Sequence, residues 1–259
     1  MSSIKKRKHP RLLRYMQSLQ GDRPWGTFLD AGTGVQSIRW VADLDTEHWT
    51  AISASPFDAQ RVSDAIKDKQ RPDDRIIQGN WVNPELLKGE VFDTVMADYL
   101  LGAVDRFAPY FQPYLFKRLR PLTGKRLYVK GLEPYVPTQR PDDKAGRILW
   151  EIGRFRDACV LHGDDRPYRE YPAGWVIDNL RMTGFKVLNV KHFDIRYKKL
   201  FVNAQIDVCA PILDKFPDQN LAKALKARGE AIRAEALEVI ETEGALSAGR
   251  NYVIAAEPE

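Results

Sequence analysis

The chain has 259 residues, 44% of them apolar and 29% charged, which is ordinary for a soluble globular protein and sufficient for one α/β domain with a sizeable core. No stretch approaches the roughly 18 apolar residues of a membrane span, and no apolar run follows the basic N-terminal residues as in a secretory signal. Residues 5–8 and Arg11 carry as much positive charge as the whole net charge of +5, so the remainder is nearly neutral, which disfavours an enzyme with a basic nucleic-acid-binding face.

Cysteine and histidine usage argues against a disulfide framework and a metal centre. Cys159 and Cys209 lie far apart in segments predicted to be helical, and the four histidines are scattered, so the closely spaced pairs of a zinc site are missing. We therefore expect no bound metal and a reducing, intracellular location, the cytoplasm. The basic run at residues 5–8 is interpreted as a solvated leader, with phosphate contact or a targeting signal as alternatives.

The first half of the chain alternates between predicted strands and helices. A helix over residues 10–20 ends at Gly21 and Pro24, and a buried strand over residues 25–30 then leads into a glycine turn. Later strands are predicted at residues 49–52, 75–78 and 90–97, and later helices at residues 35–44, 57–69 and 107–120. This alternation predicts βαβ units and a parallel sheet.

The second half adds three strands and several amphipathic helices. The strands are predicted at residues 125–130, 185–193 and 250–256, and the helices at residues 146–161, 174–182, 200–212 and 220–243. Apolar residues recur every three or four positions in the last two helices, which indicates core or interface surface and leaves a homodimer open. We divide the chain into a basic leader with a helix, residues 1–24, and one domain, residues 25–259.

The strongest local signal is the turn Asp30-Ala31-Gly32-Thr33-Gly34, between a strand and a helix. Its glycines allow a tight turn and close approach of the backbone to a ligand. A pyrophosphate-binding loop would need a third glycine or an alanine where Ser37 stands. An acidic residue before Gly-x-Gly instead suits a ligand with a positively charged amino acid end, and a purely structural turn is the alternative.

Together with two later segments, this turn resembles the class I S-adenosylmethionine-dependent methyltransferases. Residues 92–98, Phe-Asp-Thr-Val-Met-Ala-Asp, are similar to the family's fourth-strand motif, and residues 119–129 are similar to its segment before strand five. The resemblance covers residues 25–195 and the final strand. It implies a doubly wound, mostly parallel, seven-stranded Rossmann-like sheet, methyl transfer as the reaction, and S-adenosyl-L-methionine as the cofactor.

The same resemblance assigns roles to matching positions. Asn80 and Trp81 would contact the adenine, with a core aromatic as the alternative for Trp81. The acid that usually ends strand two and holds the ribose is missing, so Ser53 or Asp58 is the substitute, and Gln36 stands where the family has its third glycine. The expected cofactor-binding residues are Asp30, Ala31, Gly32, Gly34, Ser53, Asn80, Trp81 and Asp98.

Methyl transfer needs an aligned acceptor, exclusion of water, and a base only when the acceptor arrives protonated. Asp98, Tyr99, Glu133 and His162 are the candidate catalytic residues, with a surface charge or a satisfied loop hydrogen bond as the alternative for each. Two insertions, at about residues 133–171 and 197–243, are expected to cover the site as lids. Arginines beside aromatics in the first could hold an anionic acceptor group or single-stranded nucleic acid, or be exposed and ion-paired.

These observations give three functional hypotheses. The first is methylation of a small-molecule acceptor, because enclosing insertions and a nearly neutral body suit a small pocket. The second is an RNA methyltransferase that uses the basic N-terminal tail. The third is a noncatalytic cofactor-binding protein whose C-terminal helices form a dimer.

Overall fold

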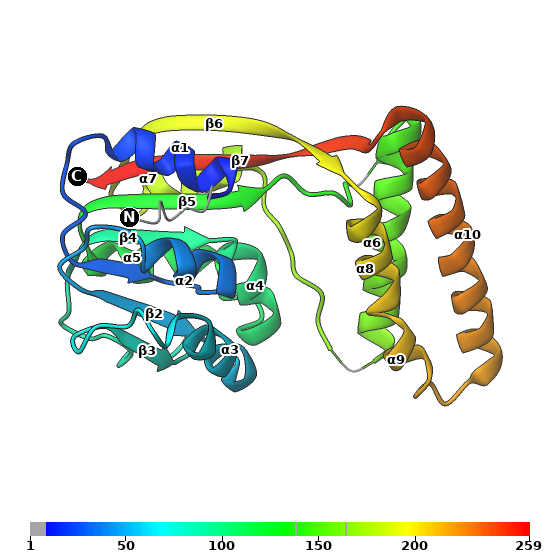
Figure 1. Ribbon diagram of the computed structural model, residues 1–259, viewed down its shortest axis with the longest axis horizontal. Coiled ribbons are helices and arrows are strands. Elements are labelled where there is room, and N and C mark those ends of the chain that lie inside the picture. Colours follow the sequence, from blue (N-terminus) through cyan, green and yellow to red (C-terminus); the bar gives the residue numbers. More distant parts are fainter. Residues whose placement is uncertain (1–8, 138, 164) are drawn as a thin grey trace, which may run out of the picture.

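The computed structural model describes residues 9–137, 139–163 and 165–259 (Figure 1). The basic run at residues 5–8 lies outside the described residues. The strands are β1 (Phe28–Asp30), β2 (Trp49–Ser53), β3 (Arg75–Gln78), β4 (Phe92–Asp98), β5 (Thr123–Leu132), β6 (Phe185–Tyr197) and β7 (Leu246–Pro258). The helices are α1 (Arg11–Gln20), α2 (Val35–Val41), α3 (Pro56–Ile66), α4 (Leu100–Phe107), α5 (Leu115–Leu119), α6 (Lys144–His162), α7 (Ala173–Met182), α8 (Lys199–Asp207), α9 (Ala210–Leu213) and α10 (Gln219–Glu243).

The strands form one seven-stranded sheet in the order β3-β2-β1-β4-β5-β7-β6. The pairs from β3 to β5 are parallel, whereas β7 runs antiparallel to both β5 and β6. The predicted doubly wound, mostly parallel, seven-stranded α/β fold is therefore confirmed. The strand order reverses between β1 and β4, and in such sheets ligands bind at the carboxyl ends of the strands beside this reversal.

Helices cover both faces of the sheet because successive strand residues point to opposite sides. On one face, Phe28 packs in a buried cluster with residues of α1, α2 and α3. On the other face, the adjacent Leu29 packs in a cluster with residues of α4, α5 and α7. Helix α1 is part of this core, since Leu13 and Met16 are fully buried and Tyr128 donates a hydrogen bond to Gln20 over 2.7 Å.

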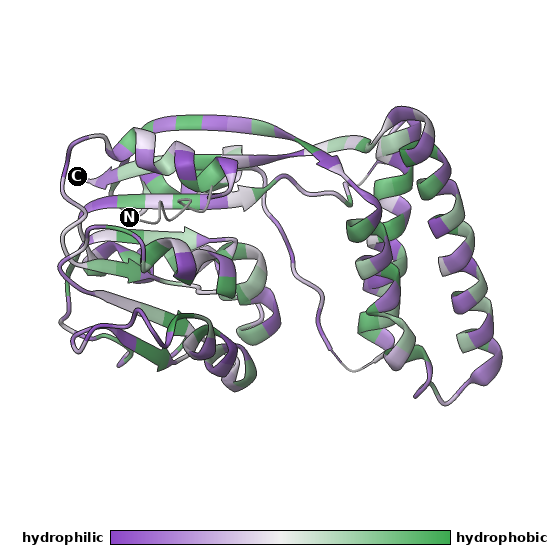
Figure 2. Cartoon of the chain, viewed as in Figure 1, coloured by the Kyte–Doolittle hydropathy of each residue, from purple (hydrophilic) through white to green (hydrophobic). Residues whose placement is uncertain are grey.

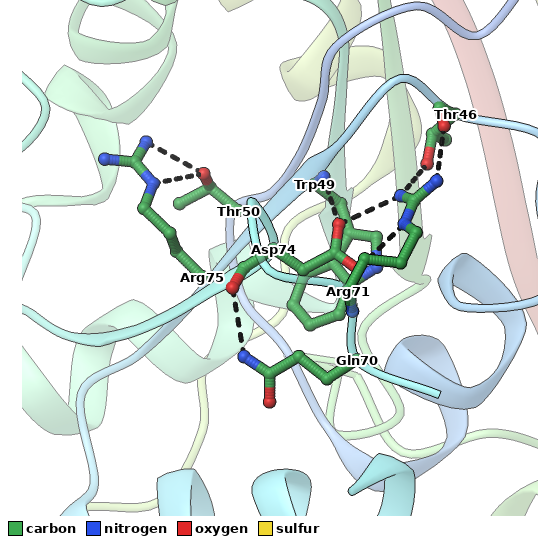
Figure 3. Close-up of polar contacts among 7 residues, drawn as sticks. All are labelled: Thr46, Trp49, Thr50, Gln70, Arg71, Asp74 and Arg75. Carbon is green, nitrogen blue, oxygen red and sulfur yellow. Dashed lines mark hydrogen bonds and ion pairs between the residues drawn. The ribbon is translucent and has the colours of Figure 1, made fainter. Parts of the chain in front are cut away.

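A polar cluster fixes the amino ends of β2 and β3 (Figure 3). The side chain of Asp74 is fully buried and accepts hydrogen bonds from the Trp49 N–H at 3.0 Å and from the N–H and guanidinium of Arg71 at 2.8 to 3.0 Å. The same guanidinium donates to Thr46. Because every buried polar group here has a partner, this end of the sheet is closed and rigid.

The two predicted insertions come together as one helical bundle. Helices α6, α8, α9 and α10 share a buried cluster of their own, beyond the ends of β6 and β7 (Figure 1). Each long helix of the bundle carries both apolar and polar residues (Figure 2), as an amphipathic helix must when it buries one side. Gly229 of α10 lies against the Phe155 ring of α6, where a Cβ would come within 2.7 Å of the ring, so a glycine permits this close contact.

Two predicted helices and two predicted strands differ from the structure. The helix predicted at residues 107–120 is absent: α4 precedes it, Tyr110 adopts a φ of 68°, and only the short α5 follows. The helix predicted at residues 200–212 is divided into α8 and α9, and Pro211, which has no N–H, lies at the start of the second. Strands β6 and β7 each continue beyond their predicted ends into the bundle. Among the described residues, no helix combines the length and apolarity that crossing a membrane requires.

Candidate functional site

A cleft with about 570 Å³ of empty space, partly open to solvent, lies at the carboxyl ends of β1, β2, β3 and β4. Six of the predicted cofactor-binding residues line it: Ala31, Gly32, Ser53, Asn80, Trp81 and Asp98. Asp30 directly precedes, and Gly34 directly follows, the lining residues 31–33. The structure thus places the residues of four separate sequence segments around one cleft.

The glycine turn is held in one conformation by contacts to its neighbours. The Ala31 N–H donates to the Met96 carbonyl at 2.8 Å, and the Thr33 N–H donates to the Ile52 carbonyl at 2.9 Å. Gly32 lies directly on Leu100, since a Cβ at this glycine would be 2.7 Å from the Leu100 side chain. The turn therefore requires glycine at position 32, whereas a Cβ on Gly34 would point into open space.

Trp81 supports the turn through its ring. The indole is buried, and its Nε1–H donates to the Ala31 carbonyl over 2.8 Å. The ring is thus part of the wall of the cleft, as the core interpretation expected. The main-chain N–H of Trp81 donates no hydrogen bond to another described residue, so it is free to donate to a ligand.

Ser37 stands where a pyrophosphate-binding loop would have its third glycine, and in the structure it stabilises the start of α2. Its hydroxyl accepts from the Gly34 N–H at 2.9 Å and donates to the Gly34 carbonyl at 3.0 Å. The signal that could have revealed it is the Ser at the third position of the helix, where a short side chain can reach back to the capping residue.

Asp30 is the most unusual group of the site. Its carboxylate is fully buried at the end of β1, and neither oxygen has a hydrogen-bond partner of normal geometry among the described residues. Burial, together with the nearby charge of Asp98, raises the pKa of Asp30 to about 7, while Ser37, Thr33 and the Gly32 N–H lie close enough to offset part of the rise.

Asp98, at the end of β4, is paired with a cation that the sequence analysis did not assign. Its Oδ1 lies 2.6 Å from the Nζ of Lys130, and both side chains are nearly inaccessible to solvent. Burial raises the pKa of Asp98, and Lys130 opposes this rise. The two residues are opposite one another in the register of β4 and β5. The Lys130 ammonium also lies 4.5 Å from the Tyr99 ring centre.

Tyr99 turns the chain from β4 into α4 in a left-handed conformation, with a φ of 50°. This conformation is costly for a residue with a Cβ and persists only where the surroundings impose it. Here the Tyr99 N–H donates to the Lys130 carbonyl at 2.8 Å, and the phenol donates to Asn251 at 2.8 Å. Burial and the charges of Asp98 and Glu170 raise the pKa of the phenol, which therefore stays protonated.

Three polar residues line the far side of the cleft. Asn80 donates to the Phe107 carbonyl at 2.6 Å and accepts from the Val82 N–H at 3.2 Å, which leaves one lone pair of its amide oxygen for a ligand. Ser53 donates to the Ser55 carbonyl at 3.1 Å. Asp58, in the first turn of α3, also lines the cleft. Ser53 and Asp58 thus both remain candidates for holding a ribose.

Of the four candidate catalytic residues, Asp98 alone lines this cleft, and Tyr99 follows it in the chain. His162 lies in the helical bundle beside the Phe216 ring, with ring centres 5.6 Å apart. Glu133 lies 2.9 Å from the Nε2 of His192 and accepts from the Ala173 N–H at 3.3 Å. The structure therefore brings Asp98 to the cleft, with Tyr99 adjacent to it in the chain, but not His162 or Glu133.

Two residues of the segment between α6 and α7 lie at or near the site without having been assigned to it. Tyr168 lines the cleft, and Glu170 lines two further cavities, one of which Tyr168 also lines. Neither lies in a motif or in a regular element, so only the tertiary structure reveals them.

Comparison with known proteins finds the fold repeated in solved structures. A putative methyltransferase (BH2331) from Bacillus halodurans C-125 matches with a TM-score of 0.59 and 13% identity, over 96% of this chain and 99% of that one. Mycolic acid cyclopropane synthase CmaA1, complexed with SAH and CTAB, matches with a TM-score of 0.57 and 15% identity, over 95% and 82% of the two chains. The [4+2]-cyclase SpnF matches with a TM-score of 0.55 and 15% identity, over 96% and 80%.

No family model matches the sequence, and no curated protein matches it. At identities of this size, the likeness shows a shared fold and leaves the chemistry to be argued from the site. The predicted resemblance to the methyltransferases is confirmed at the level of the fold. Because a [4+2]-cyclase shares that fold, methyl transfer requires its own evidence.

Proposed function

We propose that the chain is an S-adenosylmethionine-dependent methyltransferase that acts on a small-molecule acceptor. The buried Asp30 carboxylate, which directly precedes the lining residue Ala31 and has no partner of normal hydrogen-bond geometry among the described residues, is the observation that carries the proposal. An isolated carboxylate in such a place is costly unless a ligand supplies a cation or a donor. S-adenosylmethionine has an ammonium group and a sulfonium centre, and both are positively charged.

The charges around the cleft favour the same ligand. Asp30 and Asp98 are both buried, and Lys130 is the ion-pair partner of Asp98. Asp58 also lines the cleft and is paired with Arg61. Of these three carboxylates, Asp30 alone has no ion-pair partner in the described part of the chain; a cationic ligand would neutralise it, whereas the phosphates of a dinucleotide would be repelled.

The shape of the turn also fits the cofactor. Ala31, Gly32 and Thr33 line the cleft, so the main chain of the turn borders it, and Gly34 follows with open space where a Cβ would be. In the proposed arrangement, Asp30, Ala31, Gly32 and Gly34 hold the amino acid end. The Asn80 amide and the Trp81 N–H hold the adenine, and Ser53 or Asp58 holds the ribose. When bound, the cofactor supplies an electrophilic methyl group.

The protein's own part is to hold the acceptor in line and exclude water. Tyr99 and Asp98 are fixed beside the expected methyl position by Lys130 and Asn251. Tyr168 brings the segment between α6 and α7 to the mouth of the cleft, which supports the lid role of this insertion. The RNA-methyltransferase hypothesis depends on residues 5–8, outside the described residues, and no observation in the described part of the chain favours it or the noncatalytic dimer.

The test is calorimetric titration of S-adenosylmethionine into the wild-type protein and into Asp30→Asn. We expect saturable binding by the wild type and a loss of affinity of about tenfold or more in Asp30→Asn, because a charge-assisted contact is replaced by a neutral one. Asp22→Asn, which changes an exposed aspartate, is the matched control and should bind like the wild type. No binding to the wild type at millimolar cofactor, or equal affinities in all three proteins, would refute the proposal.

A further inference from the structure

The segment at residues 165–172 is clamped onto α4. The Arg169 N–H donates to the Gly102 carbonyl at 3.3 Å, and Gln112 donates to the carbonyls of Arg169 and Leu101 at 2.9 and 3.0 Å. Arg106 and Asp165 form an ion pair at 2.7 Å. The segment is therefore held in place, and the side chains it presents have defined positions.

Glu170, within this clamped segment, lies where three cavities approach one another. It lines two of them, one with Tyr135 and one with Tyr171, and its neighbour Tyr168 lines both the first of these and the cofactor cleft. The Glu170 carboxylate rests on Gly102 of α4, since a Cβ at this glycine would come within 2.3 Å of its Oε1. Because Gly102 has no side chain, α4 leaves space at this position for the Glu170 carboxylate.

Glu170 has no ion pair or hydrogen bond with any described residue, although arginines are near. Arg169 is paired with Asp157 at 2.6 Å. Arg156, the cation whose charge acts most on Glu170, lies 3.3 Å from Asp157 and donates to Gln205 at 2.9 Å. Asp157 is thus the contacting carboxylate of both arginines, and no described cation forms an ion pair with Glu170, so the Glu170 carboxylate is open to a cationic ligand.

The ionisable groups whose charges interact with that of Glu170 come from several elements. They are Arg156 of α6, Tyr197 of β6, Tyr252 of β7 and the phenol of Tyr99 before α4. Arg169, paired with Asp157, and Arg166, paired with Asp105, line cavities together with Glu170. Burial raises the pKa of Glu170 to about 7, while Arg156 opposes the rise. A carboxylate in cavities that tyrosines also line, Tyr135 and Tyr168 in one and Tyr171 in the other, is complementary to an organic cation through charge and through the faces of the rings.

We propose that the methyl acceptor is a small primary or secondary amine, and that Glu170 binds its ammonium form and takes up its proton. This inference rests on the proposed function. The proton passes from the ammonium nitrogen to a Glu170 oxygen, which frees the nitrogen lone pair. The nitrogen then forms a bond to the methyl carbon as the carbon–sulfur bond breaks and sulfur keeps the electron pair. S-adenosylhomocysteine and a methylated ammonium leave, and Glu170 returns its proton to solvent.

The activity test uses a panel of primary and secondary amines, each matched with the alcohol of the same skeleton; 2-phenylethylamine and 2-phenylethanol are one such pair. Transfer of radiolabelled methyl groups is expected to amines and to none of the alcohols. In Glu170→Gln, kcat should fall about 100-fold or more, the usual loss of a general base, with the affinity for S-adenosylmethionine unchanged. The wild-type kcat should rise with pH up to about 7, and this dependence should be lost in the variant.

A pair of glycine substitutions separates this role from a structural one. Gly102→Ala should displace the carboxylate and lower kcat while keeping α4 intact, because alanine is the better helix former. Gly174→Ala, in the first turn of α7, adds a Cβ where no atom lies within 4 Å and should leave kcat unchanged. Equal kcat values in the two variants would contradict the position assigned to Glu170.

Two readouts do not depend on turnover. The complex with S-adenosylhomocysteine should bind 2-phenylethylamine more tightly than 2-phenylethanol, and Glu170→Gln should abolish the difference. Glu170→Gln should also be more stable than the wild type above pH 7, because ionisation of a carboxyl with a raised pKa destabilises the folded protein.

Three results would refute the amine proposal and leave the cofactor assignment intact, provided that S-adenosylmethionine binds. They are methylation of alcohols, no methylation of any amine, and normal methylation of amines by Glu170→Gln. If S-adenosylmethionine does not bind, the proposed function itself fails.

Discussion

Two buried aspartates mark opposite edges of the same sheet. Asp74 lies at the amino ends of β2 and β3, where it accepts hydrogen bonds from Trp49 and Arg71 (Figure 3). Asp30 lies at the carboxyl end of β1, is equally enclosed, and has no partner of normal geometry among the described residues. The same residue type thus stabilises the fold at one edge and is left unsatisfied at the other.

This difference follows from the construction of parallel sheets. The loops at the amino ends can be closed completely, whereas the loops at the carboxyl ends diverge at the reversal of strand order and leave a cleft. A polar group at the closed edge is satisfied by the chain itself. A polar group at the open edge is available to a ligand, and until one binds it destabilises the fold.

The largest expected effect is on stability at the closed edge. Asp74→Ala should lower the free energy of unfolding by about 3 kcal/mol, because it leaves the Trp49 N–H buried without a partner and separates the Arg71 guanidinium from its carboxylate. The figure is at the low end for such a pair because the Arg71 side chain is partly exposed. Urea denaturation measures it, and Asp64→Ala, an exposed site on α3, should change stability by less than about 0.5 kcal/mol. A loss equal to that of the control would mean that the closed edge is not stabilised by Asp74.

A smaller effect is expected from two glycines at the open edge. Gly32→Ala would place a Cβ 2.7 Å from the Leu100 side chain and should lower stability by about 1–2 kcal/mol. Gly34→Ala has open space around its Cβ and should be close to the wild type in stability, yet weaken cofactor binding by filling the ligand side of the turn. Thermal unfolding with and without S-adenosylmethionine distinguishes the two. Normal cofactor affinity in Gly34→Ala would mean that the cofactor does not contact the turn at Gly34.

A further effect, confined to Asp30, is a pH dependence of stability. The folded-state pKa of Asp30 is raised from 3.8 to about 7, so the folded protein binds more protons than the unfolded chain between these values, and its stability falls as pH rises through this window. Asp30→Asn lacks this dependence. The stability of Asp30→Asn relative to the wild type should therefore increase from pH 4 to pH 7 and stay constant above it. A difference that does not change with pH would show that Asp30 ionises normally.

Much of the open edge could be predicted from the sequence. Asp30, Gly32 and Gly34 stand in one motif after an apolar strand, and Ser53 and Asn80 follow other predicted strands. Since carboxyl ends of parallel strands share one edge, placing these residues together required only the sequence order of the strands. The amino-edge cluster and the role of Ser37 depend on local hydrogen bonds that this reasoning did not consider.

The rest depends on packing that a single sequence does not reveal. The pairing of Lys130 with Asp98 follows from the register of β4 and β5, which the strand predictions left open. The merging of two insertions into one bundle depends on contacts between α6, α8 and α10. Glu170 stands in an irregular segment, and its position against Gly102 exists only after the bundle and α4 have been assembled.

A crystal structure of the protein with S-adenosylhomocysteine is the sharpest test of the proposed cofactor site. We expect density for the amino acid end against residues 30–34, with its ammonium group in contact with the Asp30 carboxylate and its adenine beside Asn80 and Trp81. Density in another cavity, or a cleft filled by the protein's own side chains around an unchanged Asp30, would refute this site.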